Sequence, residues 1–312
     1  MSKISRKLVL SIIAVVLTVF ALGSTTFALF TLTNTSTVQA FEAQIVADSG
    51  IEVALGNFTT VAGAPNEANW VTTLTTETVE AYLVAKYGNT QIFNHVTTAD
   101  GINFFTLGSS AMTGTSGGYI ELPLNFRSDT ANQINWTTVT LSSTTYSWTV
   151  DKDFTDVLDV ARTAGSQIPV DASNGMRIAM ISDATYGNDV VAYEKPAAGQ
   201  NVVLGAGGNL KDGVAVDEGN AGAMNYYFAK NASLPFGIEA VTTLATITDL
   251  GASGQVVSSL FDVSLITAVD FGADYYGQVM VRIWLEGWDA NTYNSILSQK
   301  VSSTFTFQGV TV

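Results

Sequence analysis

The stretch "YIELPLNF", residues 119–126, alternates large apolar residues with other residues along its length. Successive side chains of an extended chain point to opposite faces, so residues two apart share a face. The apolar residues that share one face here are Ile120, Leu122, Leu124 and Phe126. Pro123 lacks the backbone N–H of a regular ladder, which marks an edge strand or a bulge. The stretch therefore predicts a β-strand with one buried face.

The same two-residue period recurs along the chain. It appears in "GIEVALGNF" (50–58), "TTYSWTV" (144–150), "MRIAMIS" (176–182), "VMVRIWLEGW" (279–288) and "STFTFQGV" (303–310). Helical signals are fewer. The strongest covers residues 76–87, where an apolar stripe ends at Gly88, and weaker ones cover 155–165 and 289–299. Many short strands with a few surface helices predict an all-β fold, a jelly-roll-like β-sandwich.

The composition agrees with this fold class. Apolar residues make up 47% of the chain, enough for a large core, whereas charged residues make up only 13%. Thr, Ser, Asn and Gly fill the solvent positions, and these residues favour strands and turns. Residues 48–312 are expected to form one elaborated domain. The Gly-rich stretch 199–225 is interpreted as long loops on that domain, with a boundary between two domains as the alternative.

The N-terminus has the pattern of an export signal. Three basic residues precede an uncharged apolar run over residues 8–22. As a helix this run would measure about 23 Å, short of the roughly 30 Å hydrocarbon core of a membrane. Small residues favour cleavage between Ala28 and Leu29. We expect a signal peptide, 1–28, and a secreted or surface-associated protein. An uncleaved segment that extends to residue 30 and anchors the chain in the membrane is the alternative.

The charge balance excludes some partners. Removing residues 1–28 would take away three positive charges and change the formal net charge from −14 to −17. Nucleic acids and anionic lipids are bound through Lys and Arg, so neither is expected as a partner. The chain has no cysteine, which rules out disulfides and thiolate metal sites.

Few residues suit catalysis. His95 is the only histidine, and without a second imidazole or a thiolate it cannot form a usual zinc site. One G-x-S-x-G string occurs, at residues 114–118, but a predicted strand follows it and not a helix, so it lacks the context of a nucleophile elbow. Asp270 and Asp274 could form a glycosidase pair only if they lay at the required separation, which the sequence does not give. The chain is therefore not expected to be an enzyme.

Three acidic residues deserve comparison with a calcium loop. Asp151, Asp153 and Asp156 alternate in a way that could direct oxygen atoms at Ca²⁺. The run lacks the glycine and the distal glutamate of an EF-hand loop. We expect a solvated loop in which these carboxylates cap a short helix, and calcium, the one cofactor considered, is the alternative.

The five tryptophans raise the alternative of a carbohydrate-binding protein, since flat rings stack on sugars. Trp136, Trp148, Trp284 and Trp288 fall in strand-like patterns, where packing within the fold is the expected role. Only Trp70, in "PNEANW", lies in loop-like sequence.

The stretch "STTFALF", residues 24–30, resembles the N-termini of the TasA/camelysin group of secreted Gram-positive proteins. The chain has Leu29 and Phe30 where that family tends to have two aromatics or an alanine and an aromatic. The closing stretch, from "YYGQVMVRIWLEGW" to "STFTF", looks like that of many surface proteins with the same overall plan. Together the two ends cover about a fifth of the chain. The resemblance implies cleavage after Ala28 by a SipW-type signal peptidase.

The resemblance further implies a jelly-roll subunit that polymerises with itself by donating an N-terminal strand. The segment 29–47 is the candidate donor strand, with Phe30, Leu32, Val38, Phe41 and Ile45 as its apolar residues. Its alternation shifts by one residue near Ala40. Metallopeptidase activity, which has been ascribed to camelysin relatives, is not expected because H-E-x-x-H is absent. The expected function is a structural subunit of an extracellular fibre or biofilm matrix; a monomeric adhesin or carbohydrate-binding protein is the alternative.

Overall fold

The structure is a computed structural model of the chain, and most of its described residues belong to β-strands. It describes residues 36–37, 41–57, 67–88, 92–93, 95–106, 118–156, 160–182, 189–196, 223–232, 244–266, 269–287, 289, 292 and 300–312. Among these residues, no helix is both long and apolar enough to cross a membrane. The expected signal segment 1–28 lies outside the described residues.

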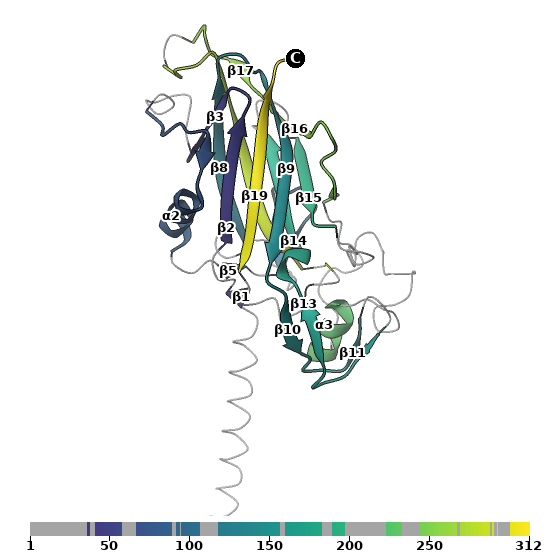
Figure 1. Ribbon diagram of the computed structural model, residues 1–312. Coiled ribbons are helices and arrows are strands. Elements are labelled where there is room, and N and C mark those ends of the chain that lie inside the picture. The colour runs from purple at the N-terminus through teal and green to yellow at the C-terminus, as the bar shows by residue number, and fades with distance from the viewer. Residues whose placement is uncertain are drawn as a thin grey trace, which may run out of the picture.

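Two sheets pack face to face (Figure 1). The five-stranded sheet has the order β16 (Gln255–Ser259), β9 (Gln133–Ser143), β19 (Val301–Val310), β2 (Phe41–Asp48) and β4 (Thr73–Leu74). The eight-stranded sheet crosses from β15 (Val190–Glu194) through β14 (Met176–Ser182), β18 (Tyr275–Glu286) and β8 (Tyr119–Ser128) to β3 (Ile51–Leu55). Its short strands β17 (Phe261–Asp262), β6 (His95–Thr98) and β7 (Phe104–Thr106) extend it along β18. The predicted all-β sandwich is confirmed.

The core lies between the inner faces of the two sheets. Trp136, Phe305 and Phe307 of the five-stranded sheet are fully buried there. Phe307 meets Phe126 of β8 across the interface, with 5.0 Å between the ring centroids. Alternation with a period of two places such residues on one face, and the facing sheets then exclude water from both.

β8, the strand predicted from "YIELPLNF", is buried on both faces and not only on one. Asn125 on its second face donates to the carbonyl oxygen of Gly56 at 2.7 Å and accepts from the hydroxyl of Tyr276 at 2.8 Å. β8 lies between β18 and β3, and it is an edge only before Leu124, where β3 ends. Pro123 falls in that edge stretch, where its missing N–H interrupts no ladder with β3.

The helix predicted over residues 76–87 is present as α2 (Thr76–Tyr87). Thr75 caps its start by accepting from the N–H of Thr78, and Gly88 ends it with a φ of 82°. Two apolar residues of the predicted stripe, Val79 and Leu83, are fully buried in the main core.

A second, smaller cluster forms at one end of the sandwich (Figure 1). It contains the antiparallel pairs β10 (Tyr146–Thr149) with β13 (Gln167–Val170) and β11 (Phe154–Thr155) with β12 (Ala161–Arg162), together with α3 (Ala223–Asn231). A 3₁₀ turn, η1 (Ala172–Asn174), leads from it back to the main sheet. Trp148, Phe154 and Tyr226 form its aromatic centre.

This cluster corrects one sequence prediction. The expected helix at 155–165 is wrong, because Thr155 pairs with Ala161 in a short antiparallel hairpin. Asp156 closes that hairpin by accepting from the N–H of Val160 at 3.0 Å and from Arg162 Nε at 2.7 Å. Of the helix expected at 289–299, only Asp289 and Thr292 lie within the described residues.

Candidate assembly site

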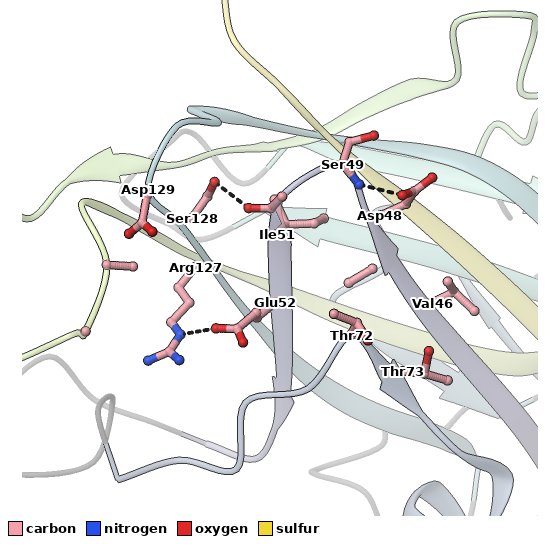
Figure 2. Close-up of a pocket in the computed structure, with 14 residues that line it drawn as sticks. Val46, Asp48, Ser49, Ile51, Glu52, Thr72, Thr73, Arg127, Ser128 and Asp129 are labelled. Carbon is pink, nitrogen blue, oxygen red and sulfur yellow. Dashed lines mark hydrogen bonds and ion pairs between the residues drawn. The ribbon is translucent and has the colours of Figure 1, made fainter.

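The candidate site is a groove at the end of the sandwich where β2 turns into β3. It has a volume of about 690 Å³, within the range of about 300–1,000 Å³ typical of ligand pockets. Its walls are the stretches 46–52, 72–73, 127–129 and 272–273. Figure 2 shows that these four stretches come from different parts of the chain and surround one hollow.

The floor of the groove is fixed by Arg127. Its Nε donates to Glu52 at 2.6 Å, the residue opposite it on β3, as Figure 2 shows. Its Nη1 donates to the carbonyl oxygen of Phe271 at 3.1 Å, and its guanidinium lies 4.8 Å from the ring centroid of Trp70. Three contacts from three segments hold this cation in place, so the groove is a preformed feature of the fold.

The turn from β2 to β3 forms one wall of the groove. Ser49 and Gly50 both have positive φ, 59° and 77°, which reverses the chain within two residues and passes it from one sheet to the other. Asp48 accepts from the N–H of Ser49, and Ser128 donates to the carbonyl oxygen of Gly50 at 2.8 Å. The lining is rich in backbone and small side chains, a surface suited to an extended peptide.

The predicted donor strand is only partly described. Ala28, Leu29, Phe30, Leu32 and Val38 lie outside the described residues. Two residues of the segment are described, and they form the short strand β1 (Ser36–Thr37). β1 and β5 (Ile92–Phe93) form a two-stranded sheet that is separate from the two large sheets.

From residue 41 onward the segment belongs to the chain's own five-stranded sheet. Phe41 opens β2 opposite Val301, and Ile45 is fully buried in the core. β2 runs parallel to β19 along its whole length. The stretch 41–47 is thus part of this molecule's own sheet, with Ala43, Ile45 and Ala47 facing the core.

The three aspartates considered for calcium each have donors within the protein. Asp151 accepts from Tyr226 Oη at 3.0 Å and from Lys230. Asp153 accepts from the N–H of Ala164 at 2.7 Å, and Asp156 closes the β11–β12 hairpin. In the part of the chain that the structure describes, no group of three or more His, Cys, Asp or Glu side chains is arranged to hold a metal ion.

Three of the four tryptophans expected to pack within the fold are described, and all three are buried. Trp136 and Trp284 are fully buried, and Trp148 is buried in the small cluster. Trp70 is half-buried: Tyr276 meets it edge-on at 6.2 Å and the guanidinium of Arg127 lies against its ring. Trp288 lies outside the described residues. None of the residues that line the groove is aromatic, so the groove does not have the stacking platform of a sugar site.

Sequence reasoning missed a buried ionic cluster in the eight-stranded sheet. Arg177 of β14 is 1% exposed and ion-paired with Glu194 and with Asp289, the latter at 2.5 Å. Burial disfavours its charged form, but the two carboxylates outweigh that effect and raise the pKa of Arg177. A third buried carboxylate, Glu286, accepts from Trp284 Nε1 at 3.0 Å. An arginine within a strand-like pattern gives no sign that its side chain is buried.

A second polar cluster lies where the small cluster joins the main sheet. Asp171 accepts from Ser143, from Ser173 Oγ at 2.6 Å and from Lys195 Nζ at 3.0 Å. Burial acts to raise the pKa of Asp171, yet these hydrogen bonds and the charge of Lys195 lower it overall. All its partners are internal, so the cluster joins segments and offers no free reactive group. His95 opens β6 beside Leu285 of β18, and only its backbone is described.

Comparisons of the chain with protein-family models, with curated proteins and with solved structures found no match.

Proposed function

We propose that this protein is a structural subunit of an extracellular fibre or biofilm matrix. In this proposal the chain is exported, processed between Ala28 and Leu29, and assembled without a cofactor from jelly-roll-like subunits. Residues 29–40 of one copy enter the groove of the next copy, which requires residues 36–37 to leave their pairing with β5. The proposal assigns no catalytic role.

One observation supports this proposal most directly: the N-terminal segment and the groove lie at opposite ends of β2. In Figure 1, β1 lies at the end of the sandwich where β2 begins, and the turn after Asp48 lies at the other end. Eight residues of strand separate the two ends by about 26 Å. A contact between opposite ends of two copies is head-to-tail, and such contacts generate open filaments.

The chemistry of the two partners is compatible. Residues 29–40 contain no ionised side chain, and Phe30, Leu32 and Val38 are spaced along them. Val46 is a partly exposed apolar residue of the groove, and the acidic residues of the groove do not repel a segment whose only charge after processing is the α-ammonium group of Leu29. An extended segment bound by backbone hydrogen bonds, with its side chains in pockets, is a common mode of peptide recognition.

The test compares three forms of the protein by electron microscopy. The secreted chain that starts at Leu29 should form filaments, and a chain that starts at Phe41 should not. Starting at Phe41 keeps β2, whose removal would take Ile45 from the core. The form that starts at Leu29 but has Phe30→Asp and Leu32→Asp should also fail to assemble, since two charges would have to enter the groove without partners.

A matched pair of variants tests the groove itself. Ala273→Arg fills the groove and should block filaments, whereas Ala164→Arg, at an exposed turn in the small cluster, should leave them unchanged. Filaments from the chain that starts at Phe41 would refute donation by residues 29–40. A monomer from every form would favour the alternative, a monomeric adhesin or carbohydrate-binding protein.

A further inference from the structure

The outer face of the five-stranded sheet displays an ordered array of small polar side chains. β9 and β19 pair so that Thr138 lies opposite Thr306, Thr140 opposite Thr304 and Ser142 opposite Ser302. The parallel strand β2 continues the rows with Val46, Gln44 and Glu42. We call these nine residues the threonine face: Glu42, Gln44, Val46, Thr138, Thr140, Ser142, Ser302, Thr304 and Thr306.

The threonine face is accessible. Gln44, Thr138, Thr140 and Ser142 are exposed, and the other five residues are half-buried. In Figure 1, β2, β19 and β9 lie nearest the viewer, and neither α2 nor α3 crosses them. The three strands are eight, ten and eleven residues long, and the rows form a regular surface over five residues of each, up to the register shift after Thr306.

The charge of the threonine face differs from that of the chain as a whole. The chain has a formal net charge of −14, so two copies repel each other over most approaches. Glu42 is the one ionisable residue of the face, and Lys300 forms an ion pair with it. Two copies that approach with these faces together therefore avoid like-charge contact.

The side chains are also complementary to copies of themselves. Each threonine presents a methyl group and a hydroxyl that both donates and accepts, and the hydroxyls of Ser142 and Ser302 already bond at 2.9 Å across strands. Facing sheets of small, uncharged side chains interdigitate at a separation of about 10 Å. A contact between identical patches has the self-complementary form of a two-fold interface.

The area indicates how strong such a contact can be. Three strands about 4.8 Å apart, each contributing a stretch of five residues, cover roughly 240 Å² per copy, or roughly 480 Å² for a pair. Stable independent interfaces bury about 1,200–2,000 Å² in total, so a single pair should be weak. Copies aligned in a filament would make many such contacts at once, and the linked contacts would then hold firmly.

From these observations we infer that the threonine face is a self-association surface, which a second copy of this chain covers and through which neighbouring filaments bundle side by side. The bundling rests on the proposed function, but the pairing of two copies does not. The inference concerns the outer sheet face, which shares only Val46 with the described lining of the groove at the end of the sandwich.

The test places charge on the threonine face of the secreted chain. Thr138 and Thr304 lie diagonally across β9 and β19, and the described hydrogen bonds of these two residues use their backbone atoms, which a change of side chain leaves in place. The variant Thr138→Glu with Thr304→Glu should form single filaments in electron micrographs where the wild type forms bundles. The matched control, Thr149→Glu with Thr163→Glu, has the same charge at exposed positions of the small cluster and should bundle normally.

Two single substitutions that keep the size of the side chain test the same surface with less risk of misfolding. Gln44→Glu adds one charge to the threonine face without changing its shape, and Gln167→Glu does the same on the exposed side of β13. Sedimentation equilibrium of the same proteins measures pairing even if no filaments form. Gln44→Glu should weaken pairing by about tenfold or more, because each copy faces the other's new charge, and Gln167→Glu should not weaken it.

The outcomes separate the two proposals. Single filaments from the wild type, with no pairing in sedimentation, would contradict self-association through the threonine face and would leave the fibre proposal intact. The opposite result is pairing without filaments. If only the substitutions on the threonine face weakened that pairing, the result would support self-association through this face and count against the proposed fibre function. Binding of each protein to insoluble cellulose is measured alongside. If the Glu variants reduced only that binding, the face would be a polysaccharide site and the inference would be wrong.

Discussion

At the scale of single residues, Arg177 is the most consequential polar side chain that the structure describes. Its guanidinium lies in the eight-stranded sheet with Glu194 and Asp289, and all three residues are buried. Removing one partner of such a group leaves the others charged and without water, which costs more than the group contributes when complete. The cluster therefore makes the fold depend on a complete set of partners.

We predict that Arg177→Met lowers the free energy of unfolding by about 3–5 kcal/mol, measured by urea denaturation. Lys300→Met, which removes the exposed partner of Glu42, is the control and should change it by less than about 1 kcal/mol. Equal losses in the two variants would show that burial of the cluster is of no special importance.

At the scale of elements, the structure covers an exposed strand edge with a helix. Where β8 extends beyond β3, the N–H of Glu121 points away from the ladder and donates to Tyr87 Oη at 2.9 Å. Lys86 pairs with the carboxylate of Glu121 at 3.3 Å. The last turn of α2 thus satisfies an edge that could otherwise pair with another chain. Burial raises the pKa of Tyr87, so its hydroxyl stays neutral near neutral pH.

Tyr87→Phe should lower the free energy of unfolding by about 1–3 kcal/mol, because the N–H of Glu121 would lose its acceptor in a part-buried site. Hydrogen exchange at the Glu121 amide should become faster than in the wild type. Tyr146→Phe, at a ring that is half exposed, should change neither quantity. Unchanged exchange at Glu121 in Tyr87→Phe would mean that α2 does not protect this edge.

The sequence predicts elements better than it predicts partners. A period of two identifies the strands that become β3, β8, β14, β18 and β19, and capping residues identify α2, because these signals are local. Residues 155–165 form a hairpin because Asp156 satisfies two donors there, and no local pattern reveals that contact. The groove draws on four distant segments, so its lining could not be read from any one of them.

At the scale of the whole molecule, net charge governs how copies approach. The acidic chain keeps copies apart at low ionic strength, and the threonine face is the proposed exception. Salt shortens the range of repulsion from about 30 Å at 0.01 M to about 8 Å at 0.15 M. At 0.15 M the range of repulsion is therefore less than the separation of about 10 Å between facing sheets, so the charges of two paired copies are largely screened from each other.

Raising the ionic strength from about 0.01 M to about 0.15 M should therefore increase side-by-side association of the chain that starts at Leu29, measured by light scattering at neutral pH. An association held by ion pairs would respond in the opposite way. The variant Thr138→Glu with Thr304→Glu should need more salt than the wild type to reach the same scattering. Scattering that falls as salt is added would contradict an uncharged contact.

The parallel pairing of β2 with β19 also has a consequence for the order of folding. Roughly 250 residues separate these neighbouring strands, and β19 also forms the full ladder with β9. The five-stranded sheet therefore cannot close while residues 301–310 are still being synthesised. Contacts this distant in sequence form slowly. The chain thus passes through a stage in which Phe305 and Phe307 have yet to cover the core, and during that stage the inner faces of the sandwich are open to water.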